Sequence, residues 1–99
     1  MMIKRIVKME FKSDEIEVFK NIFDKHKSLI RDFEGCEHLE LWQDVKNKSV
    51  FMTYSYWQSE KHLEEYRHSD LFKQVWSQTK ILFSAKPQAW SVNTLHQLN

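Results

Sequence analysis

The pattern of hydrophobic and polar residues changes its period along the first third of the chain. In IKRIVKMEFK, Val7, Met9 and Phe11 alternate with charged residues, and this two-residue period predicts a strand with one exposed face. From about Asp14 the apolar residues recur every three or four positions, which predicts one long amphipathic helix that ends at Gly35. The apolar stripe of this helix is formed by Ile16, Phe19, Ile22, Phe23, His26, Ile30 and Phe33.

A two-residue period returns after Gly35 and predicts a β-hairpin. In CEHLELWQD, Leu39 and Leu41 fall on one face. His38 and Trp42 fall on the other face, and DVKNKS supplies the turn. The third run, SVFMTYSYW, is apolar on both faces, as is typical of a strand that is covered on both sides. One face of this run carries Val50, Met52, Tyr54 and Tyr56, and the other carries Phe51, Thr53, Ser55 and Trp57.

Two serines mark the start of two short helices. Ser59 and Ser69 each precede an amphipathic run, and serine is a favourable N-cap residue. Pro87 ends the helical part, and QAWSVNTL predicts a last strand. The order strand, helix, strand, strand, helices, strand is the split βαβ arrangement. The sequence therefore predicts a single domain over residues 1–99 of the α+β class, with a ferredoxin-like four-stranded antiparallel sheet and helices on one face.

The second face of this sheet needs a cover. The helices cover only one face, yet the second and third strands carry apolar side chains on both, and a chain of 99 residues has no further element to bury them. An extended apolar patch of this kind marks an interaction surface, and most homo-oligomers are two-fold dimers. We therefore expect a homodimer that forms through the open sheet face.

Composition and charge exclude several classes of partner. Fifteen basic and fourteen acidic residues are interspersed, so neither a nucleic-acid footprint nor an acidic-ligand bias is visible. The longest uncharged run, from Ser49 to Ser59, is shorter than the roughly 20 residues that cross a bilayer. The first residues carry a charge at every second or third position, unlike a signal peptide, and a cytoplasmic location is expected. Cys36 is the one cysteine, so no intrachain disulfide and no thiolate metal cluster is expected.

The string YSYWQSEKHLEEYRHSDLF resembles a signature of the antibiotic biosynthesis monooxygenase (ABM) family. In that signature a tryptophan ends the third strand, a serine two places later opens a helix, and a serine followed by an aromatic residue opens the next helix. Trp57, Ser59, Ser69 and Phe72 occupy these positions. The resemblance implies a subunit that dimerises through its sheet into an α+β barrel, with a cleft between sheet and helices in each subunit. Some members oxidise phenolic polycycles to quinones with molecular oxygen and no cofactor, others degrade haem, and many have no known activity.

The haem-degrading branch is a poor match. Its pattern has an asparagine on the first strand, a tryptophan on the helix after the third strand and an iron-binding histidine on the next helix. The matching positions here hold Val7 or one of its neighbours, Tyr66 and Trp76. A tryptophan has no free lone pair for iron, and His62 and His68 lie elsewhere on the preceding helix. No cofactor and no bound metal are expected.

The quinone-forming branch offers a partial match and a set of candidate catalytic residues. Cofactor-free oxygenation needs a dry apolar pocket and donors aimed at the developing oxyanion, and Trp57 and Tyr66 are candidates for these donors. His38 is a candidate general base if it lines the cleft. Further candidate substrate contacts are Thr53, His62, Trp42, His26 and Trp76.

Structural roles explain the same residues. In this interpretation Trp57 fills the end of the barrel as a core residue. The tyrosines of the third strand belong to the dimer interface. The histidines form hydrogen bonds with nearby backbone.

Two functions therefore remain open. The first is a cofactor-independent monooxygenase that acts on a phenol, a hydroquinone or a similar aromatic compound. The second is a non-catalytic dimeric module that binds a ligand or acts in a stress response. A cavity below about 300 Å³ is too small for a drug-sized substrate and favours the second function.

Overall fold

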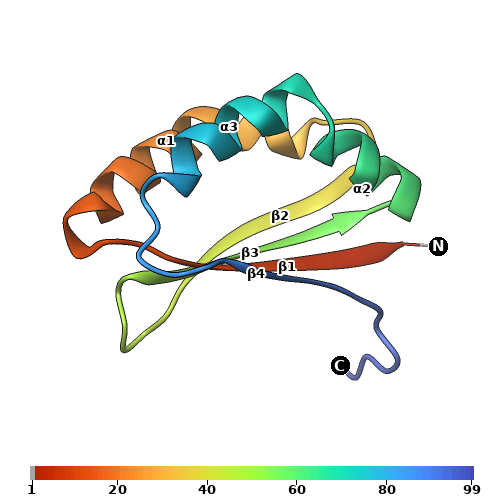
Figure 1. The fold of residues 1–99 in the computed structure, drawn as a ribbon. Helices are drawn as coiled ribbons and strands as arrows, with labels where there is room; N and C mark the ends of the chain where they lie inside the picture. Colours follow the sequence, from red (N-terminus) through yellow and green to blue (C-terminus); the bar gives the residue numbers. More distant parts are fainter. Residues whose placement is uncertain (1) are drawn as a thin grey trace.

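A four-stranded antiparallel sheet carries all the helices on one of its faces (Figure 1). The structure is a computed structural model that describes residues 2–99. Its elements are β1 (Ile3–Glu10), η1 (Ser13–Glu15), α1 (Ile16–Arg31), β2 (Cys36–Gln43), β3 (Val50–Trp57), α2 (Glu60–Arg67), α3 (Asp70–Lys80) and β4 (Gln88–Val92). The predicted α+β, ferredoxin-like fold is confirmed.

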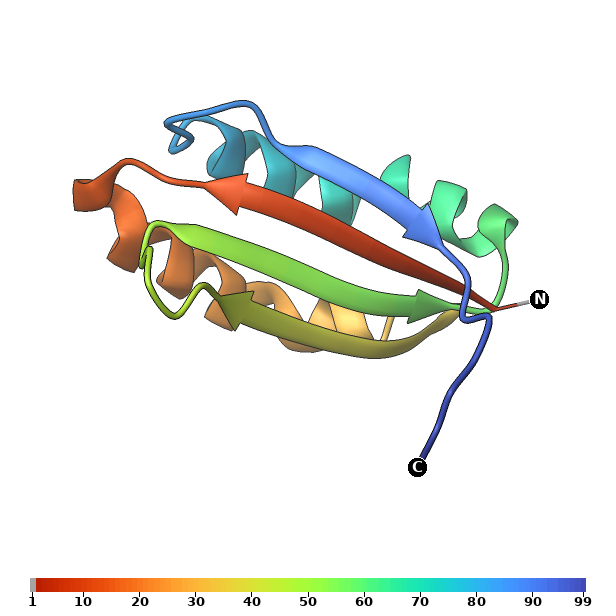
Figure 2. The same cartoon turned by 90° about the horizontal axis from the view of Figure 1, so that it is seen from below.

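The strand order is β2-β3-β1-β4, as the view from below the sheet shows (Figure 2). β1 pairs along its whole length with β3, from Ile3 opposite Trp57 to Glu10 opposite Val50. β2 and β4 pair with the outer edges of β3 and β1. Because α1 connects β1 to β2, which are parallel and separated by β3, the topology is the split βαβ arrangement.

The side chains of the strands alternate between the two faces of the sheet, as the sequence predicts. Leu39 and Leu41 of β2 are partly buried beneath the helices, and Phe51, Ser55 and Trp57 of β3 are buried with them. The opposite face is free of helices and is called the open face below. It carries His38, Glu40 and Trp42 of β2, Met52, Tyr54 and Tyr56 of β3, Lys4, Ile6 and Lys8 of β1, and Trp90 and Val92 of β4.

Two buried clusters hold the helices on the sheet. The larger one joins Met9, Phe11, Phe19, Phe51 and Leu82, and the rings of Phe11 and Phe19 stack with centroids 4.1 Å apart. The smaller cluster, of Cys36, Trp57 and Leu63, lies at the other end of the sheet. A gap in the packing between these clusters becomes the site described below.

Both predicted serine caps are confirmed. The Ser59 hydroxyl accepts a hydrogen bond from the His62 backbone N–H at 3.2 Å, and the Ser69 hydroxyl accepts one from the Phe72 N–H at 3.1 Å. These bonds satisfy backbone donors that a helix N-terminus otherwise leaves unpaired. They fix the start of α2 and of α3.

Two element boundaries differ from the prediction. The long helix ends at Arg31 rather than at Gly35, which adopts a positive φ of 91° in the turn that follows. The last strand ends at Val92, although the alternation continues to Leu95. Val92 pairs with Lys4 near the start of β1, so no partner strand remains for the residues beyond it. No helix among residues 2–99 is long and apolar enough to cross a membrane.

Candidate functional site

A cleft of about 290 Å³ lies between the sheet and the three α-helices, and its walls are mostly apolar. An apolar cavity of about 150 Å³ holds one benzene molecule, so this cleft has room for a ligand of one or two rings. The volume lies just below the limit of about 300 Å³ stated above. It therefore favours the non-catalytic module over an enzyme for polycyclic phenols, and it leaves room for a smaller substrate.

Trp57 is 1% exposed at the end of this cleft, and its indole N–H is already used. Its Nε1 donates a hydrogen bond to the Ser55 hydroxyl at 3.0 Å. A hydroxyl that accepts one hydrogen bond still has its own proton to donate. Ser55, which also lines the cleft, therefore keeps a free donor, and Trp57 holds it in place; the Thr53 hydroxyl on the same strand is a second donor.

Tyr66 reaches the cleft from α2 and packs within an aromatic cluster. Its ring stacks on Trp57 with centroids 4.8 Å apart, and the rings of Phe33 and Phe72 meet it edge-on at 5.4 and 5.3 Å. Burial raises the pKa of the Tyr66 phenol far above its usual value, and the nearby Cys36 thiol adds to this effect. The phenol therefore stays protonated at neutral pH. Within residues 2–99 no hydrogen bond involves its hydroxyl, and no unpartnered side-chain oxygen there is fully buried, so the Tyr66 hydroxyl is accessible to water or to a ligand.

Two of the predicted substrate contacts also line the cleft. Thr53 lines it from β3, two residues before Ser55 and on the same face of the strand. Trp76 lines it from α3. The Trp76 ring stacks on Phe72 with centroids 5.7 Å apart and planes 11° apart. The structure thus brings Trp57, Tyr66, Thr53 and Trp76 together around one cleft, as the sequence predicts.

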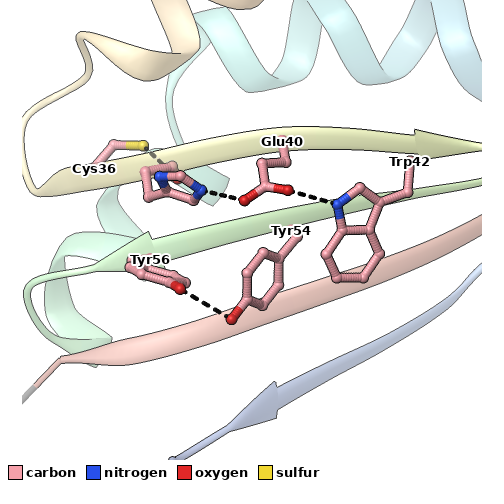
Figure 3. Close-up of polar contacts among 6 residues, drawn as sticks. Cys36, Glu40, Trp42, Tyr54 and Tyr56 are labelled. Carbon is pink, nitrogen blue, oxygen red and sulfur yellow. Dashed lines mark hydrogen bonds and ion pairs between the residues drawn. The ribbon is translucent and has the colours of Figure 1, made fainter. Parts of the chain in front are cut away.

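His38 and Trp42 do not line the cleft, because they lie on the open face of the sheet. The Glu40 carboxylate sits between them: it contacts the His38 ring, and it accepts a hydrogen bond from Trp42 Nε1 at 2.8 Å (Figure 3). Both contacts lower the pKa of the Glu40 carboxyl, and the hydrogen bond from Trp42 has the larger effect. His38 was a candidate general base only if it lines the cleft. Because it lies on the opposite face of the sheet, it is not a general base for a ligand in the cleft.

His26 and His62 do not reach the cleft either. His26 Nδ1 lies 2.7 Å from the Ile22 carbonyl oxygen, one turn earlier in α1. His62 Nδ1 lies 2.7 Å from the Ser59 hydroxyl, and its ring packs over Gly35. Both histidines hold local backbone structure. Among the residues that the structure describes, no three His, Cys, Asp or Glu side chains gather as a metal ion requires.

The model of one protein family matches this sequence over residues 2–76, and that family is described as antibiotic biosynthesis monooxygenase. The chain belongs to the ABM family. No curated protein matches the sequence significantly.

Solved structures show how closely this ABM family member shares its fold with others. A conserved protein of Methanosarcina mazei Go1 has a TM-score of 0.87 and 19% identity over 92% of this chain and 90% of its own. A Mycobacterium tuberculosis protein has a TM-score of 0.89 and 15% identity over 100% of both chains. A structure described as an antibiotic biosynthesis monooxygenase has a TM-score of 0.89 and 14% identity over 95% of this chain and 99% of its own. At these identities the likeness concerns the fold.

Three residues that the sequence analysis matched to the haem-degrading pattern of the ABM family lie around the cleft. Val7, Tyr66 and Trp76 line it, whereas Ile6 and Lys8, the neighbours of Val7, do not. No histidine of the described residues lines the cleft, so the iron-binding histidine of that pattern has no counterpart there. The residues present do not fit the haem site of that pattern.

Arg5 also lines the cleft, although the sequence analysis did not predict it as a site residue. It lies on the covered face of β1, opposite Ser55 of β3 and Ser91 of β4, and its Nη1 donates a hydrogen bond to the Ser91 hydroxyl at 3.1 Å. Burial lowers the pKa of the Arg5 guanidinium, and the positive charge of Arg67 lowers it further. The sequence contained a sign of this role. Arg5 lies two residues before Val7 and therefore on the same face of the strand, which places a charged residue among the side chains that the helices cover.

Proposed function

We propose that this protein is a cofactor-independent monooxygenase that oxidises a hydroxylated aromatic compound of one or two rings to a quinone. The observation that supports this proposal is an apolar cleft lined by the hydroxyls of Tyr66, Ser55 and Thr53, none of which donates a hydrogen bond within the described residues. Membership of the ABM family agrees with a monooxygenase role. The cytoplasmic location expected from the sequence stays a prediction.

The reaction needs no external reductant. A phenol that loses its proton passes one electron to O₂, which gives a phenoxyl radical and superoxide. The two combine at a ring carbon, and loss of water leaves a quinone. One oxygen atom enters the product and the other leaves in water, so the phenol supplies the electrons that reduce O₂.

The cleft residues favour the first of these steps. Hydrogen-bond donors in a site that excludes water stabilise a phenolate far better than water-exposed donors do. Tyr66 and Ser55 supply such donors from the mostly apolar walls of the cleft when a bound ring displaces its water. No histidine, lysine, aspartate or glutamate of the described residues lines the cleft, so the acceptor of the phenol proton in this proposal is water.

We also propose that a second copy of this chain covers the open face. Trp42 and Trp90 are 39% and 44% exposed there, on either side of the partly buried Tyr54 and Tyr56. Aromatic residues of this kind are enriched in the centres of protein interfaces. The apolar side chains extend over all four strands, which suits a self-complementary sheet contact. Light scattering that shows a monomer at micromolar concentration contradicts this proposal.

A non-catalytic module that binds a small ligand is the second candidate function. The cleft volume, just below that of most drug-sized sites, favours it, and so does the position of His38 outside the cleft. A module of this kind binds an aromatic ligand and consumes no oxygen.

Oxygen uptake distinguishes the two functions. The purified protein, free of added metal and flavin, is assayed with phenols, naphthols and hydroquinones of one and two rings. We expect uptake above the spontaneous rate and a more than tenfold loss in Tyr66→Phe, because a transition-state donor is removed. Tyr56→Phe is the matched control, since it deletes the same hydroxyl on the open face. Uptake that never exceeds the spontaneous rate favours the binding module, and unchanged uptake in Tyr66→Phe removes Tyr66 from the mechanism.

A further inference from the structure

We infer that the cleft binds an aromatic carboxylate of one or two rings, whose carboxylate pairs with Arg5 and whose ring lies among the aromatic side chains. The inference deepens the proposed function, because it names the substrate class of the same cleft. Its test measures binding alone, so it stands or falls separately from turnover.

The charged residues that line the cleft favour an anionic ligand. Its charged lining residues are Arg5 and Arg67, and no aspartate or glutamate lines it. Arg67 already forms an ion pair with Glu64, 2.9 Å between Nη1 and Oε1, and both side chains are more than two-fifths exposed. Arg5 forms no ion pair among residues 2–99: the Glu64 carboxylate favours its charge from a distance, but the repulsion from Arg67 is the stronger of the two effects. The cleft therefore contains one guanidinium without a directly paired carboxylate.

The donors around Arg5 suit a carboxylate. A guanidinium has five N–H donors in a planar fork, and the hydrogen bond to Ser91 uses one of them. The remaining donors match the two oxygens of a carboxylate, which arginine binds through paired hydrogen bonds. Ser55 stands beside Arg5 in the sheet and retains its hydroxyl proton. An anion at this place receives donors from two adjacent strands.

The rest of the cleft suits a ring. Along β1, the covered face passes from Arg5 to Val7 and then to Met9. The helices add Phe72 and Trp76 opposite these side chains. The cleft is therefore polar at the Arg5 end and apolar toward Met9. A ligand with an anionic head and an aromatic body satisfies both ends, whereas a neutral ring leaves the guanidinium unpaired.

The probe pair is 2-naphthoate and the neutral 2-naphthamide, which has nearly the same shape. In calorimetric titrations of the wild-type protein we expect 2-naphthoate to bind at least about tenfold more tightly, since hydrogen bonds between charged groups are the strong ones. The variant Arg5→Gln is expected to lose about tenfold in affinity for 2-naphthoate and to keep its affinity for 2-naphthamide. Lys8→Gln is the matched control, because it removes a positive charge from the other face of the same strand.

Several outcomes overturn the inference. They are equal affinity of the wild-type protein for both probes, no binding of either, unchanged 2-naphthoate binding in Arg5→Gln, and displacement of 2-naphthoate by equimolar inorganic phosphate. The comparison of the two probes on the wild-type protein holds even if Arg5→Gln does not fold. Neither probe is a phenol. Preferential 2-naphthoate binding without oxygen uptake on any phenol supports this inference and refutes the proposed function, and uptake on neutral naphthols without a carboxylate preference does the reverse.

Discussion

The indole nitrogen of Trp57 donates a hydrogen bond to the hydroxyl of Ser55, 3.0 Å away on the same face of β3. Both side chains are buried, so neither has water as a substitute partner. Ser55→Ala leaves the indole N–H unpaired in the core. We expect the free energy of unfolding to fall by about 1 to 3 kcal/mol in urea titrations, the usual cost of an unsatisfied buried group.

A double-mutant cycle separates this hydrogen bond from the loss of packing. Trp57→Phe removes the donor and part of the ring, and Ser55→Ala removes the acceptor. In the double variant the destabilisation is expected to be smaller than the sum of the two single values by about 1 kcal/mol, as for residues in direct contact. Strict additivity contradicts a significant Trp57–Ser55 bond.

The raised pKa of Tyr66 predicts a loss of stability at alkaline pH. A tyrosine in the unfolded chain loses its proton near pH 10, whereas in the folded protein Tyr66 keeps it to higher pH. Above about pH 10 the unfolded state therefore binds fewer protons, and the free energy of unfolding falls as the pH rises. Below that pH the contribution is fully present and constant.

Tyr66→Phe provides the comparison for this alkaline effect. Without the titrating hydroxyl, the free energy of unfolding is expected to decline less steeply from pH 9 to pH 11 than in the wild-type protein. Tyr54, whose pKa is also raised, chiefly by its hydrogen bond to Tyr56, remains in both proteins and cancels. Parallel curves over this range contradict the expected burial of the Tyr66 phenol.

The fold was predictable from the sequence because the period of the apolar residues changes clearly from strand to helix and back. Leu39 and Leu41 separate from His38 and Trp42 in the sequence as they do in the sheet. The capping serines likewise need only a local hydrogen bond, which the order of residues already favours. Features of this kind depend on neighbours along the chain.

The candidate site was less predictable because its features depend on distant neighbours. Alternation places His38 on one face, but the helices decide which face becomes the cleft. The partnership of Trp57 and Ser55 depends on side-chain rotamers. The importance of Arg5 depends on the absence of a carboxylate from elements far away in the sequence, and no local pattern reports that.

The turn at Gly35 is predicted to tolerate no side chain. Its φ of 91° lies in the region that favours glycine, and a Cβ there would overlap the ring of His62 on α2. Gly35→Ala is therefore expected to destabilise the protein by more than about 1 kcal/mol, the cost of the backbone conformation alone. The nearest atom to such a Cβ is the His62 Cβ, so only glycine at position 62 removes the whole overlap. Thermal unfolding is therefore compared for Gly35→Ala made in the wild-type protein and in His62→Gly, where only the backbone cost remains. An equal loss of stability in both backgrounds contradicts the contact.

Tyr54 lies near the middle of the open face, where it tests the proposed dimer. The Trp42 ring stacks on it with centroids 4.7 Å apart, and its hydroxyl donates a hydrogen bond to that of Tyr56 at 3.1 Å (Figure 3). Tyr54→Arg brings two positive charges to a two-fold interface, one from each copy, and removes the aromatic contact. We expect the dimer dissociation constant to rise by at least about tenfold in sedimentation experiments. Lys61→Glu, an equally drastic charge change on the exposed side of α2, is expected to leave it unchanged. If Tyr54→Arg dimerises as tightly as the wild-type protein, the open face is not the dimer interface.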